Sequence, residues 1–452
     1  MPKPTRRSVL ISLAAVPLAS ACPSSGPVPD PEDPTPRQVT TGGPEPEPWS
    51  PDQVFDGTAF PWAVTATDVT SDGVILALQT DEPLLGVRVM EGTGGGWVEV
   101  LSEDGLEVTD GFVHVEVTAL SADRTYAYVF VTPDGRRSVV GRFRTALGAD
   151  DWRTLVIGAT SCLGSTGRPF PTLSDAASHQ LDVFCLLGDT VYADGSTTVE
   201  HYRDEYRTTF AQQGFIDVAA STSMVATWDD HEVDNNYDPS SATIQARLPA
   251  AKQAFGEALP YRQGPGGSGI WRRLQWGEVL DLFVLDCRSE RLDGRYISLE
   301  QMQWLQEGLL GSTARFKVVL NSVPITDYTS FFGELFREDR WEGYPQRTEL
   351  IDFIWTEDIG GIFWISGDFH FGSLGRVDPP GFRGDGMWEA LAGPGGSNPI
   401  GAVEFFAVDD QVPFFIADWT WLRVEADPMA GTLLVQFIDG EGSVVQERLL
   451  EV

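Results

Sequence analysis

The sequence of 452 residues is poor in histidine and cysteine. Because it holds only five histidines, a metal centre built mainly from imidazoles has few donors to draw on. Its four cysteines are Cys22, Cys162, Cys185 and Cys287. With Cys22 set aside as a candidate for lipid modification, an odd number remains, which argues against a disulfide framework. Cys185 and Cys287 lie in apolar runs and are expected to be buried hydrophobes, whereas Cys162 lies among polar residues, where a thiolate ligand is expected.

Lysine is scarcer still, and basic residues as a whole are outnumbered. The three lysines are Lys3, Lys252 and Lys317, and 31 basic residues face 66 acidic ones, for a net charge of −35. Such a surface repels nucleic acid and anionic lipid at long range, so we expect no nucleic-acid binding. A bound metal ion would still attract a phosphate locally. We expect a monomer.

The amino terminus lacks an apolar run long enough to span a membrane. Thr5-Arg-Arg-Ser8, an apolar stretch to Leu18 and small residues before Cys22 are typical of an export signal over residues 1–22. The start resembles a twin-arginine signal, with an ordinary secretory signal as the alternative. Ala19-Ser-Ala-Cys22 resembles a lipoprotein cleavage box, with simple cleavage as the alternative. We therefore expect an exported protein, periplasmic or extracellular, and a membrane contact only through a lipid on Cys22.

Two further segments precede the part that carries the chemistry. Residues 23–53 are rich in proline, glycine and acidic residues and predict an extended tether. Residues 54–147 contain short alternating runs, such as 113–117, separated by turn residues, and predict a small β-sandwich. Leu120 followed by Tyr126 resembles the corner of fibronectin type III modules. We favour a packing role for this domain over partner or glycan binding.

Five apolar runs in residues 152–452 end in polar clusters. The runs span residues 154–160, 183–187, 224–228, 316–320 and 361–367. The clusters that follow are Ser161-Cys162, Asp189 with Tyr192, Asp229 to Glu232, Asn321, and Asp368-Phe-His370. One strand ending in Gly-Asp is an ordinary turn. Five such exits in one chain indicate a convergent site, because open α/β sheets place their chemistry at the carboxyl ends of strands.

The order of these clusters resembles that of the metallophosphoesterases, and the substituted residues resemble the PhoD-type alkaline phosphatase and phosphodiesterase family. Three motifs carry the resemblance: Gly188-Asp-x-x-Tyr192, Trp228-Asp-Asp-His-Glu-Val-Asp-Asn-Asn-Tyr237 and Gly367-Asp-x-His370. The resemblance runs from about residue 54 to the end of the chain. It implies an α/β (α+β) double-sheet sandwich flanked by helices, preceded by a small all-β sandwich domain. It also implies roles for individual residues.

In the metallophosphoesterase pattern, Asp230 replaces an Asn that binds the second metal, and His231 keeps the His that serves the leaving group. Asn235 or Asn236 would complete the metal shell or contact phosphate. Asn321 takes the place of a metal-binding His, as an oxygen donor.

Arg288 belongs to a family-like Asp-x-Arg segment. It is a candidate phosphate clamp, because its guanidinium matches phosphate oxygens. A structural ion pair with Asp286 is an equal alternative. Gly393-Pro-Gly-Gly396 predicts a mobile loop near the cleft.

The donor types indicate two different metals. Three of the five histidines, His114, His179 and His201, are expected outside the site, so a His-rich centre is not available. One donor set contains a thiolate and a phenolate and favours Fe(III); it comprises Cys162, Tyr192, His370 and the bridging Asp189. The other set contains only oxygen donors and suits Ca²⁺; it comprises Asp189, Asp230, Asn321 and Asp368. The family resemblance implies the same iron and calcium pair.

The expected reaction is hydrolysis of phosphomonoesters, phosphodiesters or both, in small molecules or lipids, by in-line attack of a metal-held hydroxide. His231 would protonate or hold the leaving oxygen. A phospholipase-D-like phosphodiesterase is one alternative. Another is a surface lipoprotein that kept the fold and binds ligands without turnover. Competent donors or acids at all the assigned positions favour an enzyme.

Overall fold

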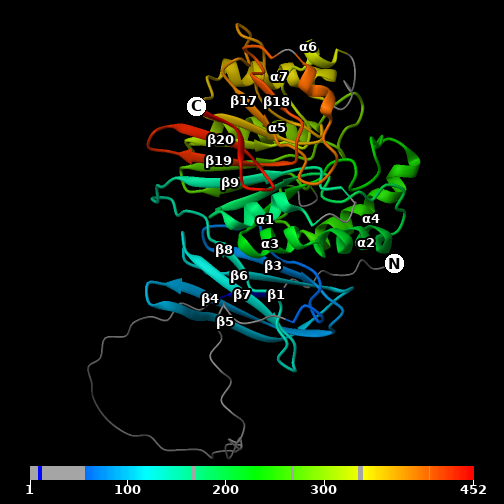
Figure 1. The fold of residues 1–452 in the computed structure, drawn as a ribbon, viewed down its shortest axis with the longest axis vertical. Helices are drawn as coiled ribbons and strands as arrows, with labels where there is room; N and C mark the ends of the chain where they lie inside the picture. Colours follow the sequence, from blue (N-terminus) through cyan, green and yellow to red (C-terminus); the bar gives the residue numbers. More distant parts are fainter. Residues whose placement is uncertain (1–8, 13–55, 165–168, 266–268, 334–339, 407) are drawn as a thin grey trace, which may run out of the picture.

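The computed structural model describes residues 9–12, 56–164, 169–265, 269–333, 340–406 and 408–452. Two large sheets packed face to face form its centre, one of ten strands and one of seven, and a separate four-stranded sheet lies at one end (Figure 1). Helices cover the outer faces of the two large sheets. This arrangement confirms the predicted double-sheet sandwich flanked by helices.

The ten-stranded sheet has parallel strands at its centre. These are β9 (Leu155–Thr160), β10 (Val183–Leu187) and β11 (Met224–Thr227). Next to β9, three antiparallel strands continue the sheet: β19 (Thr420–Asp427), β20 (Thr432–Asp439) and β21 (Val444–Glu451). The central strands therefore all end at the same edge.

The seven-stranded sheet contains a second parallel block. In order of position, its strands are β12 (Arg272–Trp276), β13 (Leu280–Val284), β14 (Phe316–Leu320), β15 (Ile362–Ser366), β17 (Trp388–Leu391), β16 (Gly372–Arg376) and β18 (Phe414–Ile416). The strands from β13 to β17 in this order run parallel.

The side chains of β10 show why these apolar runs became central strands. Val183, Cys185 and Leu187 point into the core between the sheets, and Phe184 and Leu186 point outward under helices. The covering helices on this side are α1 (Pro171–Ser178), α2 (Val199–Phe210), α3 (Gln213–Ser221) and α4 (Ala242–Ala258). On the other side they are α5 (Leu299–Gly311) and α7 (Pro345–Thr356). A strand buried on both faces is apolar throughout, as its sequence is.

The amino-terminal sandwich shares a sheet with the rest of the molecule. Its first layer is β2 (Val64–Thr67), β3 (Gly73–Gln79) and β6 (Phe112–Thr118), which extend the ten-stranded sheet. Its second layer is β4 (Leu84–Thr93), β5 (Gly96–Glu107), β7 (Thr125–Val131) and β8 (Gly141–Arg144). The junction is a parallel pairing of β2 with β11, at Thr67 and Met224.

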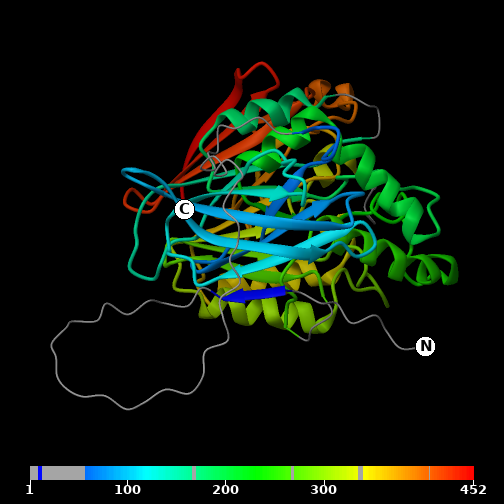
Figure 2. The same cartoon turned by 90° about the horizontal axis from the view of Figure 1, so that it is seen from below.

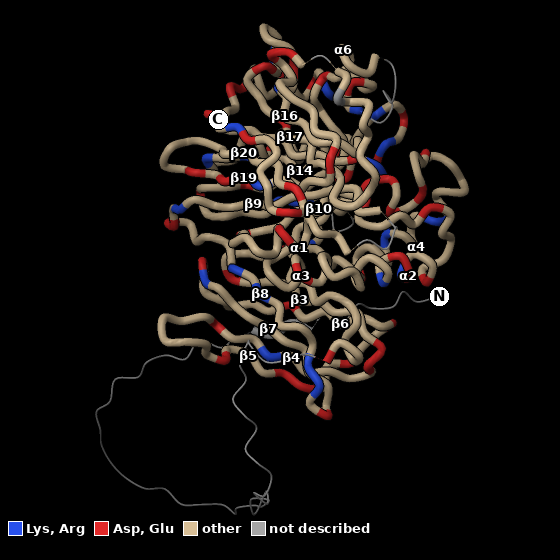
Figure 3. Tube along the Cα trace, viewed as in Figure 1, with Lys and Arg blue, Asp and Glu red and all other residues tan. Residues whose placement is uncertain are grey.

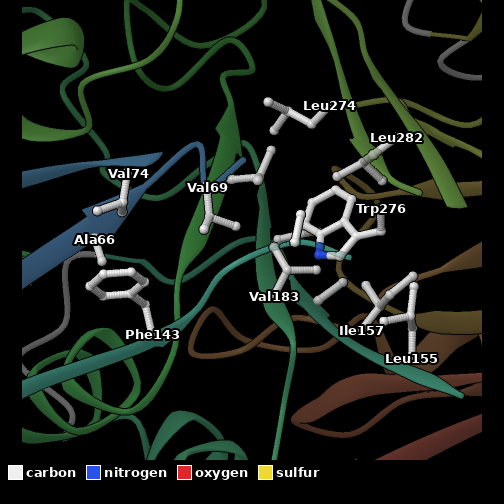
Figure 4. Packing of buried hydrophobic residues seen from close by; sticks show 14 of the residues in the cluster. Ala66, Val69, Val74, Phe143, Leu155, Ile157, Val183, Leu274, Trp276 and Leu282 are labelled. Carbon is white, nitrogen blue, oxygen red and sulfur yellow. The ribbon is translucent and has the colours of Figure 1, made fainter. Parts of the chain in front are cut away.

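The hydrophobic core is continuous across this junction. One buried cluster contains Ala66 and Phe143 from the sandwich, Ile157 and Val183 from the ten-stranded sheet, and Trp276 from the seven-stranded sheet (Figure 4).

A buried ion pair also crosses the junction. Asp68, which directly follows β2, binds Arg272 of β12 through both carboxylate oxygens, each at 2.6 Å. The same carboxylate accepts a hydrogen bond from the Arg262 backbone N–H. The sandwich is therefore joined to the remainder by a sheet, a core and a buried charge pair.

Most of the predicted leader and the whole predicted tether lie outside the described residues. From the leader, Val9–Ser12 forms β1, which pairs in parallel with β6 at the edge of the ten-stranded sheet (Figure 2). Among the described residues, no helix combines the length and apolarity needed to cross a membrane. Asp and Glu are spread over every part of the described chain (Figure 3).

Candidate active site

The exits of four central strands bring acidic and sulfur side chains together. Three groups have candidate ligand atoms within 4.8 Å of one another: Cys162, Asp189 and His370; Asp189, Asp230 and His231; and Asp189, Asp229, Asp230 and Asp368. Asp189 belongs to all three groups. A carboxylate in that position can bridge two metal ions.

Tyr192 joins the first of these groups. Its phenol oxygen lies 3.2 Å from Asp189 Oδ2 and 3.1 Å from His370 Nε2. The first group therefore offers a thiol, a phenol, an imidazole and a carboxylate at one point. All four residues of the predicted iron set meet there.

The backbone at these residues is unusual. Cys162, Asp189, Asp368 and His370 all have positive φ angles, between 50° and 73°. Such angles are uncommon outside glycine and cost free energy, and they cluster at functional sites. Gly188, directly before Asp189, also has a positive φ, of 95°, and a Cβ there would lie 2.4 Å from Asp229 Cβ. The β10 and β11 exits can approach this closely only without that side chain.

Glu232 holds these two exits in place. Its buried carboxylate accepts backbone N–H groups from Asp189 (3.0 Å), Thr190 (2.7 Å) and Asp229 (2.8 Å). Burial raises the pKa of Glu232 to about 7, against the lowering effect of those N–H donors. Glu232 thus acts as a clamp between two strand ends rather than as a member of the ligand groups.

Arg288, which follows β13, is a buried cation beside the third group, that of Asp189, Asp229, Asp230 and Asp368. Its guanidinium makes a two-pronged ion pair with Asp229, at 2.6 and 2.9 Å. Its Nη2 atom also lies 3.5 Å from Asp368 and 3.8 Å from Asp230. Asp286, the partner considered from the sequence, accepts hydrogen bonds from the Arg288 backbone N–H and the Trp228 indole. Asp229 is therefore an ion-pair partner of the Arg288 side chain that the sequence did not reveal.

The electrostatics of the site fit a cation. Burial and the neighbouring Asp230 and Asp229 raise the pKa of Asp189, and burial and Asp189 raise the pKa of Cys162 and of Tyr192. Among the described residues, no hydrogen-bond partner reaches Asp189 Oδ1, although it is buried. Carboxylates this close repel one another unless positive charge compensates them. The residues present therefore fit metal ions, whose binding would draw off these protons.

His231 is oriented by a carboxylate. Its Nδ1 atom lies 2.8 Å from one oxygen of Asp194 and 2.9 Å from the other, and its ring stacks on Tyr192 with centroids 4.0 Å apart. Burial opposes protonation of His231, but Asp194 and then Asp230 outweigh it and raise the pKa. Since Nδ1 is engaged, Nε2 is the ring nitrogen left for chemistry.

Residues 393–397 form a buried wall beside Cys162. Gly395 N–H donates to Ser161 O, and the N–H groups of Gly396 and Ser397 donate to Cys162 O. A Cβ at Gly396 would lie 2.1 Å from Leu163 O, so close packing requires glycine. The prediction of a mobile loop at Gly393–Gly396 is not supported, because these residues are buried and hydrogen-bonded. The glycines serve close approach rather than mobility.

Comparison with known proteins adds a family to this geometry. The family model of PhoD-like phosphatases matches residues 156–415, which is more than half of the chain and spans the strand exits that form the site. The chain belongs to the PhoD-like phosphatase family.

Known relatives agree with this assignment. Alkaline phosphatase D of Bacillus subtilis (strain 168) is 27% identical over 310 residues, covering 57% of this chain and 53% of the relative. This PhoD-like chain thus spans about half the length of that curated relative.

Two solved structures share the fold. One, titled "Structure of PhoD", is 22% identical with a TM-score of 0.74, covering 88% of this chain and 90% of its own. Purple acid phosphatase PPD1 from yellow lupin (Lupinus luteus) seeds is 13% identical with a TM-score of 0.63, covering 87% and 74%. Both likenesses concern the fold.

Asn321 and Asn235, both assigned from the PhoD-type resemblance, make hydrogen bonds outside the three ligand groups. Asn321 Oδ1 accepts hydrogen bonds from Cys287 (2.9 Å) and the Trp341 indole (3.2 Å), and its Nδ2 has no partner among the described residues. An indole N–H only donates, so it fixes the amide oxygen on the Trp341 side. Asn235 has an exposed side chain, and its backbone N–H donates to Asp194. For these two, a ligand or phosphate role stays a prediction.

Three residues of the PhoD-like site were not expected from the sequence. Asp194 orients His231, Ser322 donates to Asp229 at 2.7 Å, and Ser397 donates to the Tyr192 oxygen at 2.7 Å. Asp194 stands two residues after Tyr192 and Ser322 directly follows Asn321, so proximity to known motifs could have drawn attention to both. Ser397 directly follows Gly393–Gly396, but its partner Tyr192 is 205 positions away in the chain, so its contact with the phenol could not be inferred.

Proposed function

We propose that this chain is an exported, metal-dependent phosphoesterase of the alkaline phosphatase D type that hydrolyses phosphomonoesters, phosphodiesters or both. The observation that carries the proposal is the position of Asp189, which is shared by a sulfur- and phenol-containing donor group and by a carboxylate group. Membership of the PhoD-like phosphatase family supports the same reaction class.

The two donor groups suit different ions. Cys162, Tyr192 and His370 would hold Fe(III), because anionic thiolate and phenolate donors favour it. Asp230 and Asp368 would hold Ca²⁺, and Asp189 would be shared with the iron set. Asn321 remains a third oxygen donor on the resemblance alone, because its Oδ1 already accepts hydrogen bonds from Cys287 and Trp341. When bound, the ions supply the positive charge that orients the phosphoryl group and activates water.

The chain's own residues supply the proton and the positioning. Asp194 holds His231 Nδ1, so Nε2 can donate a proton to the leaving oxygen, a contribution of about 10²–10⁴ in rate. Arg288 is buried and paired with Asp229, so we assign it to positioning the carboxylates rather than to the phosphate clamp considered from the sequence. Its Nη2 atom, 3.5 Å from Asp368, partly offsets the negative charge of the carboxylates proposed to hold Ca²⁺.

The test is hydrolysis of nitrophenyl phosphate beside bis-nitrophenyl phosphate, with added calcium and with chelator. We expect turnover that chelator removes, and the ratio of the two rates names the preferred ester. Asp189→Asn should abolish turnover and leave the circular dichroism spectrum unchanged. Full activity in that variant, or no turnover in protein shown to hold iron and calcium, contradicts the proposal; the second result favours the non-catalytic binding protein.

An aromatic cluster favours a second candidate, a phospholipase-D-like phosphodiesterase. Phe369 lies between Asp368 and His370 in the chain and packs near Phe332 and Phe371, with ring centroids 5.8 and 6.1 Å away. Phe405, on the short helix η3 (Gly401–Phe405), is 88% exposed. Phe369 and Phe371 are buried, so the exposed Phe405, whose neighbour Phe406 packs on their cluster, is the side chain that an acyl chain would contact. Release of choline from phosphatidylcholine in mixed micelles, faster than hydrolysis of the soluble diester, would select this candidate.

Export and attachment are part of the proposal. We propose a periplasmic or extracellular monomer that binds phosphate esters and no nucleic acid, consistent with the charge of −35. The mass of the mature amino-terminal peptide distinguishes the two alternatives, because a lipid on Cys22 adds mass and simple cleavage does not. In Cys22→Ala the added mass should disappear.

A further inference from the structure

One short segment contacts three different residues of the predicted iron set. The N–H groups of Gly396 and Ser397 bind Cys162 O, at 3.2 and 2.8 Å. The Ser397 hydroxyl donates to Tyr192 Oη at 2.7 Å. Asn398 O lies 3.2 Å from His370 Nδ1. The segment Gly395–Asn398 therefore borders the sulfur, phenol and imidazole donors together.

Ser397 is fixed from three directions. Its N–H binds Cys162 O, its carbonyl oxygen accepts the Trp419 indole N–H at 2.7 Å, and its hydroxyl reaches Tyr192. The residue is 7% exposed. Because its backbone is hydrogen-bonded on both sides and its side chain is buried, the Ser397 hydroxyl does not rotate freely as an exposed one would.

We propose that Ser397 is a positioning residue that tunes the iron by donating a hydrogen bond to the phenolate oxygen of Tyr192. The inference rests on the iron site of the proposed function. A hydrogen bond to a ligand atom draws electron density from it and weakens its donation to the metal. With Ser397 present, Tyr192 is a weaker donor, and the ferric state is stabilised less than by a bare phenolate.

The readout is the tyrosinate-to-Fe(III) charge-transfer band of the iron- and calcium-loaded protein, together with its reduction potential. Removing the donor in Ser397→Ala raises the energy of the phenolate electrons. We expect the band to move to longer wavelength and the reduction potential to fall. Ser397→Thr keeps a hydroxyl and should restore both values to those of the wild type.

Thr172→Val is the matched control. Thr172 Oγ1 donates to Gly395 O at 2.7 Å, so this variant removes one buried hydrogen bond of similar length from the same segment without touching the phenol. Its band should stay at the wild-type position. Tyr192→Phe should lose the band, which shows that Tyr192 is its source.

The possible results separate this inference from the proposed function. A wild-type protein that binds iron without a tyrosinate band contradicts the iron site itself. A wild-type band that is unshifted in Ser397→Ala, or shifted equally in Thr172→Val, overturns only the role of Ser397. If Ser397→Ala does not fold, Ser397→Cys takes its place, because S–H is a weaker donor of similar size; an unshifted band in that variant then overturns the inference.

Discussion

At the scale of single residues, Asp194 decides which nitrogen of His231 faces the reaction. Asp194→Asn keeps the size of the side chain and removes its charge, so the imidazolium form of His231 loses its partner. We expect kcat for nitrophenyl phosphate to fall by about 10²-fold, the lower end of what a general acid contributes. Metal content, measured by mass spectrometry, should not change.

Asp234→Asn is the control for this variant. Asp234 lies on the loop after β11 that carries His231, accepts the N–H of Gly195, the residue after Asp194, at 2.8 Å and pairs with Arg247. It should keep nearly full kcat. Equal losses in the two variants would mean that loop structure, rather than the orientation of His231, explains the effect.

The sequence could predict donor residues because strand exits leave a strong pattern. Cys162, Asp189, Asp368 and His370 each follow an apolar run, and the structure brings them together. It could not predict that Arg288 pairs with Asp229, which lies 59 positions away and on another sheet. Side-chain partners across two sheets depend on packing that no local pattern records.

At the scale of elements, Glu232 links the ends of β10 and β11. In Glu232→Gln one carboxylate oxygen becomes an NH₂ group, which cannot accept a hydrogen bond from the backbone N–H groups that face it. We expect the free energy of unfolding of the metal-free protein to fall by about 1–3 kcal/mol, because one buried N–H donor is left without an acceptor. Urea unfolding measures it. Glu307→Gln, on the exposed face of α5, should unfold as the wild type does. A wild-type midpoint for Glu232→Gln would contradict the clamp.

The short helix η2 (Trp341–Gly343) carries a carboxyl group that favours its proton. Burial and a hydrogen bond with Asp327 raise the pKa of Glu342 to about 8, against the opposing effect of Arg340. Between pH 4.5, its ordinary value, and pH 8, the folded state binds more protons than the unfolded state. Stability contributed by Glu342 is therefore full below this window and is lost as pH rises through it.

Glu342→Gln should remove this dependence. Thermal unfolding followed across the window should show a smaller decline with pH in the variant than in the wild type. Asp327, whose pKa is lowered to about 2 despite burial, acts in a separate, more acidic window. Glu349→Gln, exposed on α7, is the control. Parallel curves for the wild type and Glu342→Gln would contradict the raised pKa.

Strands were predictable where they are apolar and long enough, and missed where they are not. β9, β10, β14 and β15 coincide with expected runs. β16 (Gly372–Arg376) contains two glycines in five residues, and such composition does not favour a strand. It is held by pairing with β17 and β18 on either side. Tertiary pairing overrides local preference here.

At the scale of the whole molecule, the Asp68–Arg272 pair joins the sandwich to the rest of the described chain. Asp68→Ala leaves a buried guanidinium without its carboxylate, so we expect the free energy of unfolding to fall by about 3–5 kcal/mol. Calorimetry should show one transition in the wild type, because the core is continuous across the junction. Asp104→Ala removes a surface pair with Arg88 and should cost less than about 1 kcal/mol. A separate early transition for the sandwich would contradict the coupling.

The two-layer architecture followed from the sequence, but the shared sheet did not. The sequence predicts that the sandwich ends at residue 147 and that the next domain begins at residue 152. β2 nevertheless pairs with β11. The sequence of an edge strand does not show whether that edge stays exposed or pairs with a strand of another domain.

That shared sheet limits how such a chain can be recombined. A chimera that joins the amino-terminal part of one relative to the remainder of another has one junction in the polypeptide. At three interfaces, however, residues from the two parents would have to fit one another. The donor must supply a strand that matches the edge of β11, an aspartate that reaches Arg272 and apolar side chains that interlock with Trp276. Exchange across this junction should therefore succeed only between parents whose residues match at all three of these interfaces.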